Sequence, residues 1–136
     1  METETISNKT YNLVGDIGAT NARFALVSPG SSEMESIQSL KCSDFEDIQS
    51  AILLYLSDHP DLEIQAACFA TAGTVHLELF KLANNHWVIS KKDVKNALKG
   101  VEVQWINDLL LRPLQLLHSE MMTLSLSIRA LLSQKN

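Results

Sequence analysis

The chain has 136 residues, of which 46% are hydrophobic and 20% charged, which is the length and composition of one globular domain. Its 11 Lys and Arg residues against 16 Asp and Glu residues give a formal net charge of −5. A nucleic-acid-binding surface requires a basic face, so this class of partner is not expected. Two cysteines, Cys42 and Cys68, are too few for a disulfide framework and predict cytosolic thiols.

The first ten residues are polar and partly acidic, without the basic start and apolar centre of a signal peptide. They predict a flexible N-terminal tail over residues 1–10. The longest apolar runs fall well below the roughly 20 residues that a membrane span needs. We therefore expect a cytoplasmic protein without membrane contact.

Residues 11–27, YNLVGDIGATNARFALV, are two apolar runs on either side of a short polar centre, a pattern that predicts a β-hairpin. Gly18 is expected to supply a positive φ at the tight turn. Backbone N–H groups of such a turn can converge on an anion. The hydroxyl of Thr20 and the amide of Asn21 add further donors.

Asp16 stands where the first of these strands ends, so its carboxylate can meet a Mg²⁺ ion or the water bound to it. A carboxylate beside clustered donors suits Mg²⁺ with a nucleotide phosphate. The helix-opening P-loop pattern, G-x-x-x-x-G-K-[ST], does not occur in the chain. From these residues alone, an ordinary hairpin with a glycine turn is an equally good interpretation.

The next elements follow from turn and cap signals. A turn over residues 28–32 precedes a weak third strand at 36–40, which completes an antiparallel meander. Ser43 and Glu46 form a capping box that predicts a helix of about four turns, ended before Pro60. The unbroken apolar run at 64–71 predicts a strand buried on both faces, with Cys68 as a small core residue. Alternation at 75–80 suggests one more short strand.

A second capping box, Ser90 with Asp93, predicts a short helix that ends at Gly100 as its C′ glycine. Alternating residues then form a strand that runs into Asn107 and Asp108. An acidic residue after a strand of an α/β sheet lies where ligands bind. Asn107 could hydrogen-bond sugar hydroxyls, and Asp108 could accept the proton of an attacking hydroxyl, although these residues alone favour a helix N-cap at Asp108 over a base.

Two of these segments resemble bacterial glucokinases. Residues 15–23, Gly-Asp-Ile-Gly-Ala-Thr-Asn-Ala-Arg, resemble that family's phosphate-binding hairpin, G-D-[IV]-G-G-T-N-x-R. Residues 106–108, Ile-Asn-Asp, match the point where the family carries its catalytic base for the glucose 6-hydroxyl. Ala19 replaces the family's second glycine, and its methyl group is expected to weaken nucleotide binding.

The resemblance implies an α/β domain of the actin-like ATPase (ribonuclease H-like) class, with a mixed sheet that starts as a meander and has flanking helices. It implies ATP-dependent phosphorylation of glucose to glucose 6-phosphate, with ATP and Mg²⁺. The residues that it implies for the nucleotide phosphates and Mg²⁺ are Asp16, Gly18, Ala19, Thr20 and Asn21, with Asp16 meeting Mg²⁺ through water. It implies Asn107 and Asn84 for the sugar and Asp108 as the base.

The resemblance covers residues 11–108, and residues 109–136 form a divergent Leu-rich tail. Gly73-Thr74 stands where the family commonly has Gly-Pro, and residues 82–90 resemble the segment beside the family's sugar cleft. Because the family's second domain has no counterpart in 136 residues, we expect a truncated kinase with little activity by itself and possible self-association. The alternatives are a non-catalytic remnant or interaction module, a kinase of another hexose, and a sugar-responsive repressor, which ranks last because no helix-turn-helix precedes the hairpin.

Overall fold

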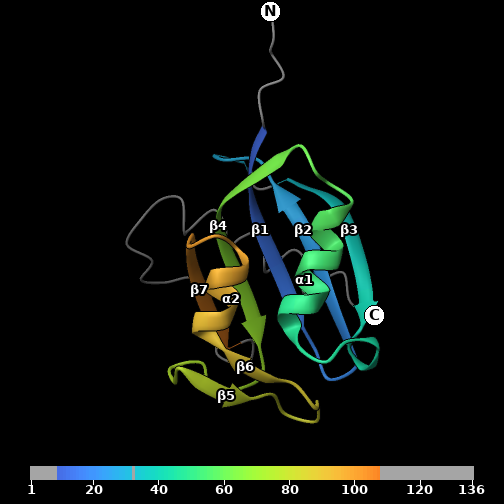
Figure 1. The fold of residues 1–136 in the computed structure, drawn as a ribbon, viewed down its shortest axis with the longest axis vertical. Helices are drawn as coiled ribbons and strands as arrows, with labels where there is room; N and C mark the ends of the chain where they lie inside the picture. Colours follow the sequence, from blue (N-terminus) through green and yellow to red (C-terminus); the bar gives the residue numbers. More distant parts are fainter. Residues whose placement is uncertain (1–8, 32, 108–136) are drawn as a thin grey trace, which may run out of the picture.

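The structure, a computed structural model, describes residues 9–31 and 33–107. Figure 1 shows its arrangement of strands and helices. The elements in chain order are β1 (Lys9–Ile17), β2 (Asn21–Val27), β3 (Met34–Lys41), the 3₁₀ helix η2 (Cys42–Asp44), α1 (Ile48–Ser57), β4 (Leu62–Thr71), β5 (Leu79–Lys81), β6 (Val88–Ser90), α2 (Lys91–Ala97) and β7 (Glu102–Asn107).

Five of the strands form one mixed sheet in the order β3-β2-β1-β4-β7, and β5 pairs with β6 in a separate two-stranded sheet. β1, β2 and β3 are antiparallel neighbours, whereas β4 lies parallel to β1 and β7 lies parallel to β4. The predicted α/β fold, with a mixed sheet that starts as a meander, is therefore confirmed.

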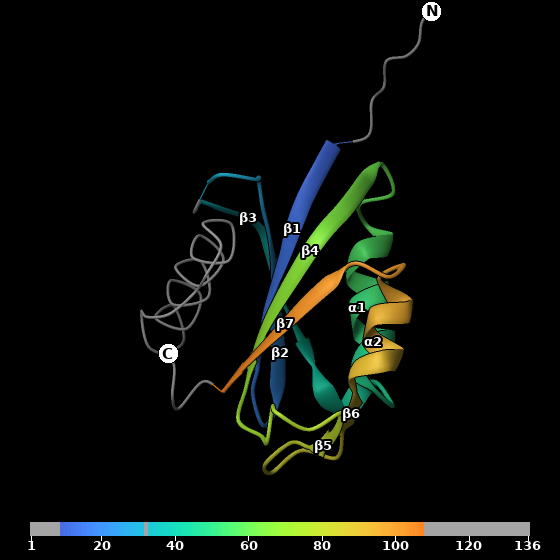
Figure 2. The ribbon, with the colours of Figure 1, turned by 90° about the vertical axis from the view of Figure 1, so that its left-hand side faces the viewer.

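Both helices cover the same face of the five-stranded sheet, as the side view shows (Figure 2). The larger apolar cluster lies between that face and the helices, because alternate strand residues such as Leu13, Phe24 and Phe69 point toward α1 and α2. A smaller cluster on the opposite face contains residues from the intervening positions, namely Val14, Ala25, Val27, Cys68 and Ala70. Cys68 is thus a buried core residue, as predicted.

The expected start of the first helix is wrong. Ser43 lies in η2, and α1 begins only at Ile48, with Asp47 as the N-cap. The Asp47 carboxylate accepts a hydrogen bond from Ser50 N at 2.9 Å, which satisfies one of the amides that a helix start leaves without a backbone acceptor. A capping carboxylate four residues downstream therefore replaces the predicted capping box.

The cap at the start of α2 is confirmed, since Ser90 Oγ accepts a hydrogen bond from Asp93 N at 3.2 Å. Its C-terminal end differs in detail from the prediction. Lys99 has a φ of 64° and occupies C′, whereas Gly100, with a φ of 86°, follows it. Gly100 N donates to Lys95 O at 2.8 Å and Lys99 N to Asn96 O at 3.1 Å, the two bonds of a Schellman motif.

Three smaller expectations also need correction. Gly18 has no positive φ, because the glycines with positive φ among the described residues are Gly30 and Gly100. The strand expected at 75–80 is β5 at Leu79–Lys81, preceded by a turn in which Leu77 N donates to Thr74 O. β1 begins at Lys9, so the last two residues of the expected tail belong to the sheet.

Within the described segments, no helix combines the length and the apolar character needed to cross a bilayer.

Candidate functional site

Three strands of the sheet end together at one edge. β1, β4 and β7 run parallel, and their last residues, Ile17, Thr71 and Asn107, stand opposite one another in the register. The carboxyl-end edge of parallel strands is where α/β proteins bind ligands. The turn between β1 and β2, residues 18–20, continues directly from this edge (Figure 1).

Asp16 lies one residue before this edge, on the opposite face of the sheet from Ile17. Its side chain is 1% exposed, and Asp16 Oδ2 lies 3.5 Å from Nη2 of Arg23, whose side chain is 16% exposed. The two residues are cross-strand partners in the register of β1 and β2. The ion pair places a fixed positive charge beside the buried carboxylate.

The carbonyl groups of the β1–β2 turn are held by two other segments of the chain. Asn85 Nδ2 donates to Gly18 O at 3.0 Å and to Ala19 O at 3.3 Å. Cys42 N donates to Thr20 O at 2.8 Å, and the Cys42 thiol lies 3.9 Å from Gly18 O. The carbonyls of Gly18, Ala19 and Thr20 therefore all accept hydrogen bonds from other segments of the protein.

This arrangement fixes the direction of the turn's N–H groups. All described peptide bonds are trans, and a trans peptide unit directs its N–H opposite to its C=O. Because the carbonyls of Gly18 and Ala19 point toward Asn85, the N–H groups of Ala19 and Thr20 point away from it. Neither N–H group donates to a backbone acceptor in the turns of the described residues. Adjacent outward donors on an exposed turn can bind an anion such as phosphate.

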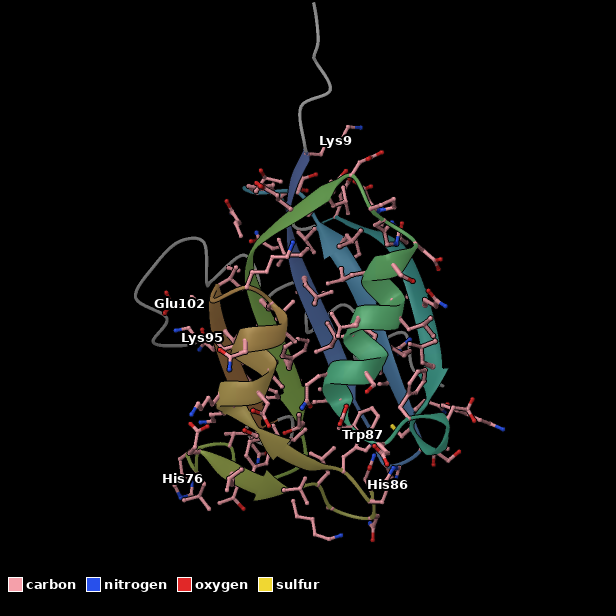
Figure 3. The ribbon with its side chains drawn as sticks, viewed as in Figure 1. Lys9, His76, His86, Trp87, Lys95 and Glu102 are labelled. Atoms are coloured by element: carbon pink, nitrogen blue, oxygen red, sulfur yellow. The ribbon has the colours of Figure 1, made fainter. Side chains whose placement is uncertain are left out.

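Asn85 belongs to the loop that joins β5 to β6, and this loop is anchored by two ring nitrogens. Trp87 Nε1 donates to Phe45 O at 3.0 Å, and His86 Nε2 donates to the same oxygen at 2.9 Å. Figure 3 shows Trp87 and His86 at the end of the molecule where the β1–β2 turn lies. The Trp87 side chain is fully buried, whereas His86 is exposed, as the sequence predicts for a loop histidine.

The predicted sugar-binding residues occupy different environments. Asn84 is exposed in the same loop and has a φ of 57°, a conformation that asparagine tolerates better than most residues. Asn107 Nδ2 donates to Gly73 O at 2.8 Å, so its side chain supports the loop after β4. Asp108, the predicted base, lies outside the described residues.

Mg²⁺ fits the predicted phosphate site only together with a nucleotide. Among residues 9–31 and 33–107, no three His, Cys, Asp or Glu side chains lie close enough to hold a metal ion between them. Asp16 is a single buried carboxylate that precedes by two residues the turn with the outward N–H donors. A Mg²⁺ ion that keeps several waters and is held by one or two carboxylates plus substrate phosphates matches that donor set.

Sequence reasoning missed the contribution of Asn85. Asn85 lies in the segment 82–90 that resembles the one beside the sugar cleft, and the sequence assigned a ligand contact there to its exposed neighbour, Asn84. Asn85 is 7% exposed and contacts the turn 66 and 67 residues earlier. The signal available in the sequence was an asparagine two residues before a tryptophan, which does not reveal a contact over that distance.

Comparison with known proteins gives consistent results. The glucokinase family model matches residues 13–120. The glucokinase of Hahella chejuensis is 43% identical over 113 residues, which are 83% of this chain and 35% of that protein. The chain thus spans about a third of the length of the curated relatives it matches.

Solved structures show the same similarity. A glucokinase from an Antarctic psychrotroph superposes with a TM-score of 0.67 and 33% identity, covering 74% of this chain and 33% of that one. The glucokinase of Balamuthia mandrillaris in complex with glucose gives a TM-score of 0.56 and 25% identity, covering 74% of this chain and 30% of that one. The described domain therefore has the actin-like ATPase fold of these sugar kinases.

Proposed function

The chain belongs to the glucokinase family, and from this premise we propose that it forms the phosphate-binding wall of a kinase that transfers the γ-phosphoryl group of ATP to the 6-hydroxyl of glucose. The observation that carries the proposal is the β1–β2 turn, whose carbonyls are bonded to Asn85 and Cys42 while two N–H groups point outward. Phosphoryl transfer depends on such positioned donors and on neutralised charge.

In this proposal the turn holds the nucleotide phosphates. The N–H groups of Ala19 and Thr20 donate to phosphate oxygens, and the Thr20 hydroxyl and Asn21 amide add side-chain donors. Gly18 lets the chain approach the phosphate without a side chain. When Mg²⁺ is bound with ATP, it supplies charge neutralisation at the phosphates, and Asp16 would hold it through water.

The sugar side of the site is proposed around the ends of β7 and of the β5–β6 loop. Asn107 and Asn84 would bind glucose hydroxyls through their amides. Asp108 follows Asn107 directly and would accept the proton of the 6-hydroxyl as it attacks the γ-phosphoryl group. Loss of a positioned general base lowers turnover by about 10²- to 10⁴-fold.

The domain organisation is part of the proposal. Residues 11–108 would correspond to the N-terminal part of the relatives, and the opposite wall of the cleft to the remaining two-thirds of their length. Catalysis needs both walls, because the second one holds the substrates in line and excludes water. The 136-residue chain alone would therefore bind nucleotide weakly and form little glucose 6-phosphate.

The test has a binding step and a turnover step. Titration calorimetry should detect Mg²⁺-dependent ATP binding by the 136-residue chain, and Thr20→Val together with Asn21→Ala should weaken it. The chain joined to the segment of the Hahella chejuensis glucokinase that follows its matched region should then form glucose 6-phosphate. In that fusion, Asp108→Asn should lower turnover by about 10²-fold or more while sparing ATP binding. Unchanged turnover would remove Asp108 from the mechanism.

A further inference from the structure

We propose that Asn85 is a positioning residue for nucleotide binding: its side-chain amide orients the β1–β2 turn so that the N–H groups of Ala19 and Thr20 face the phosphates. This inference rests on the proposed phosphate-binding function of the turn. It assigns to a buried side chain of the β5–β6 loop a role in a site formed by another part of the chain.

The first argument is the geometry of the amide. Nδ2 carries two hydrogen atoms and lies within bonding distance of two carbonyls, Gly18 O at 3.0 Å and Ala19 O at 3.3 Å. Oδ1 accepts from Trp87 N at 2.8 Å. The opposite amide orientation would set an oxygen against two carbonyl oxygens and an NH₂ group against an N–H. The hydrogen-bond pattern therefore fixes which end of the side chain faces the turn.

The second argument is that Asn85 is itself held on several sides. Lys81 Nζ donates to its backbone oxygen at 3.2 Å, in addition to the bond from Trp87 N. Trp87 is in turn bonded through its indole N–H to Phe45 O. A side chain immobilised in this way loses little further conformational freedom when it orders the turn.

The third argument comes from the peptide geometry of the turn. Rotating the peptide between Gly18 and Ala19, or the next one, exchanges the directions of its C=O and N–H groups. Such a rotation would break a bond to Asn85 in a nearly dry environment, because Asn85 is only 7% exposed. Leaving buried polar groups without partners is costly. Asn85 thus opposes the rotations that would present a carbonyl, which repels phosphate.

The contact with Cys42 supports the same arrangement. Burial raises the pKa of the Cys42 thiol, and a hydrogen bond from the Asn85 side chain partly offsets this effect. Cys42 N also donates to Thr20 O. The support therefore comes from residues on two different loops, and Asn85 is the one whose side chain contacts two successive carbonyls.

The decisive variant is Asn85→Asp, which keeps the acceptor for Trp87 N and the size of the side chain but replaces the NH₂ donor by a carboxylate oxygen. The matched control is Asn96→Asp, the same substitution at an exposed position of α2. The 136-residue chain is titrated with Mg²⁺-ATP, and hydrogen exchange is measured without nucleotide at the Gly18 and Cys42 amides, which donate to Asn21 O and Thr20 O of the turn. Global stability is measured separately by urea unfolding.

We expect Asn85→Asp to weaken Mg²⁺-ATP binding about tenfold and, because the loosened turn breaks their hydrogen bonds more often, to accelerate exchange at the Gly18 and Cys42 amides more than at the β1 amides. Asn96→Asp should change neither. If the Asn85→Asp chain does not fold, Asn85→Ser, which keeps one hydroxyl donor, should show a smaller loss of affinity and a smaller increase in exchange at the same amides.

The two proposals fail in different ways. Absence of Mg²⁺-ATP binding by the unmodified chain would overturn the proposed function of the turn, and the positioning role with it. Binding by the unmodified chain that is unchanged in Asn85→Asp, with unchanged exchange at the Gly18 and Cys42 amides, would overturn the role of Asn85 alone. Loss of urea stability with unchanged affinity would assign Asn85 a purely structural function and would also contradict the inference.

Discussion

The sheet interior around Gly15 and the turn around Gly18 stand next to each other in one sequence motif, yet they are built differently. A Cβ atom on Gly15 would lie 2.6 Å from Cδ1 of Phe69, so this glycine is required by close packing in the core. A Cβ atom on Gly18 would meet only Asn21 O, at 3.3 Å. The interior also contains Cys68, surrounded by apolar groups, whereas Cys42 beside the turn contacts polar ones.

This difference separates residues that determine the fold from residues that serve the site. The interior of β1 is specified by shape, and almost any added atom disturbs it. The turn is specified by hydrogen-bond direction, and it is exposed on its outer side. The nine-residue motif therefore has a structural half and a binding half. Substitutions around Gly15 should change stability, whereas substitutions in the turn around Gly18 should change ligand binding.

Gly15→Ala is expected to have the largest effect on stability. The new methyl group would overlap the Phe69 ring and approach Phe24 Cδ1 at 3.1 Å, and overpacking of a core costs about 1–3 kcal/mol. Gly18→Ala should cost less, because a single backbone oxygen would need to move by a few tenths of an ångström and φ is not positive. Urea unfolding of both variants measures the difference.

Phe69→Leu provides the matching control, since the smaller side chain leaves room for the methyl group. The double variant Gly15→Ala with Phe69→Leu should therefore lose less free energy of unfolding than the two single variants combined. Equal stability of Gly15→Ala and Gly18→Ala would show that the two halves of the motif do not differ in the proposed way.

The two cysteines should differ in alkaline solution. Burial raises the pKa of the Cys68 thiol from 9.0 to about 12. Between these values the unfolded chain releases a proton that the folded chain keeps, so stability falls as the pH rises above 9. Cys68→Ala should remove this contribution, which is about 1.4 kcal/mol one pH unit above the unfolded value.

Cys42→Ala should reduce the loss of unfolding free energy at alkaline pH by less than Cys68→Ala does. The reason is that the hydrogen bond from Asn85 offsets part of the effect of burial on the pKa of Cys42. Urea unfolding between pH 8 and about 10 gives both slopes. If Cys42 contributed more than Cys68 to the fall of unfolding free energy with pH, the expected difference between the sheet interior and the turn would be contradicted.

Ala19→Gly tests the turn without touching the core. Ala19 is exposed and stands where the family's hairpin has a second glycine, so removal of its methyl group should let phosphate approach the backbone more closely. We expect Mg²⁺-ATP to bind roughly three- to tenfold more tightly, or up to about 1.4 kcal/mol. Ala97→Gly at the end of α2 is the control, and it should lower stability and leave affinity unchanged. Equal or weaker binding by Ala19→Gly would show that the methyl group does not obstruct phosphate.

Lys99→Gly should have the smallest effect, and it should appear in stability alone. Lys99 has a φ of 64°, which glycine adopts without the steric cost of a Cβ atom. The expected gain is about 0.5–1 kcal/mol in the free energy of unfolding, with unchanged nucleotide affinity. A loss of stability would indicate that the Lys99 side chain stabilises the end of α2 by more than the backbone strain costs.

Most of the fold could be predicted because its signals are local. The alternation in β7, the apolar run of β4 and the cap at Ser90 each lie within a few residues of the element they define. The start of α1 was missed because Ser43 and Asp47 are both good N-caps, and tertiary contacts decide between them. Phe45 lies in extended conformation before α1, with its carbonyl bonded to Trp87.

The sequence named candidate residues for the site but did not predict how the turn that carries them is held in place. The motif located the turn but suggested a positive φ at Gly18, whereas the turn keeps its shape through contacts from distant segments. The contact of Asn85 with the turn could not be predicted from the sequence, because it depends on burial and on the orientation of the side-chain amide. The roles of Asn107 and Asp16 in binding remain predictions that the proposed experiments address.

The most direct test of the proposed phosphate-binding role of the β1–β2 turn is a titration of the isotopically labelled 136-residue chain with Mg²⁺-ATP, followed by amide chemical shifts. The largest shifts should occur at the amides of residues 18–21 and at the Asn85 side-chain NH₂ group. The alternative location is the groove of about 510 Å³ between α2 and β7, where Lys91 and Lys95 provide positive charge. Figure 3 shows Lys95 beside Glu102, another residue of this groove. Shifts confined to that groove, with residues 18–21 unchanged, would contradict the account.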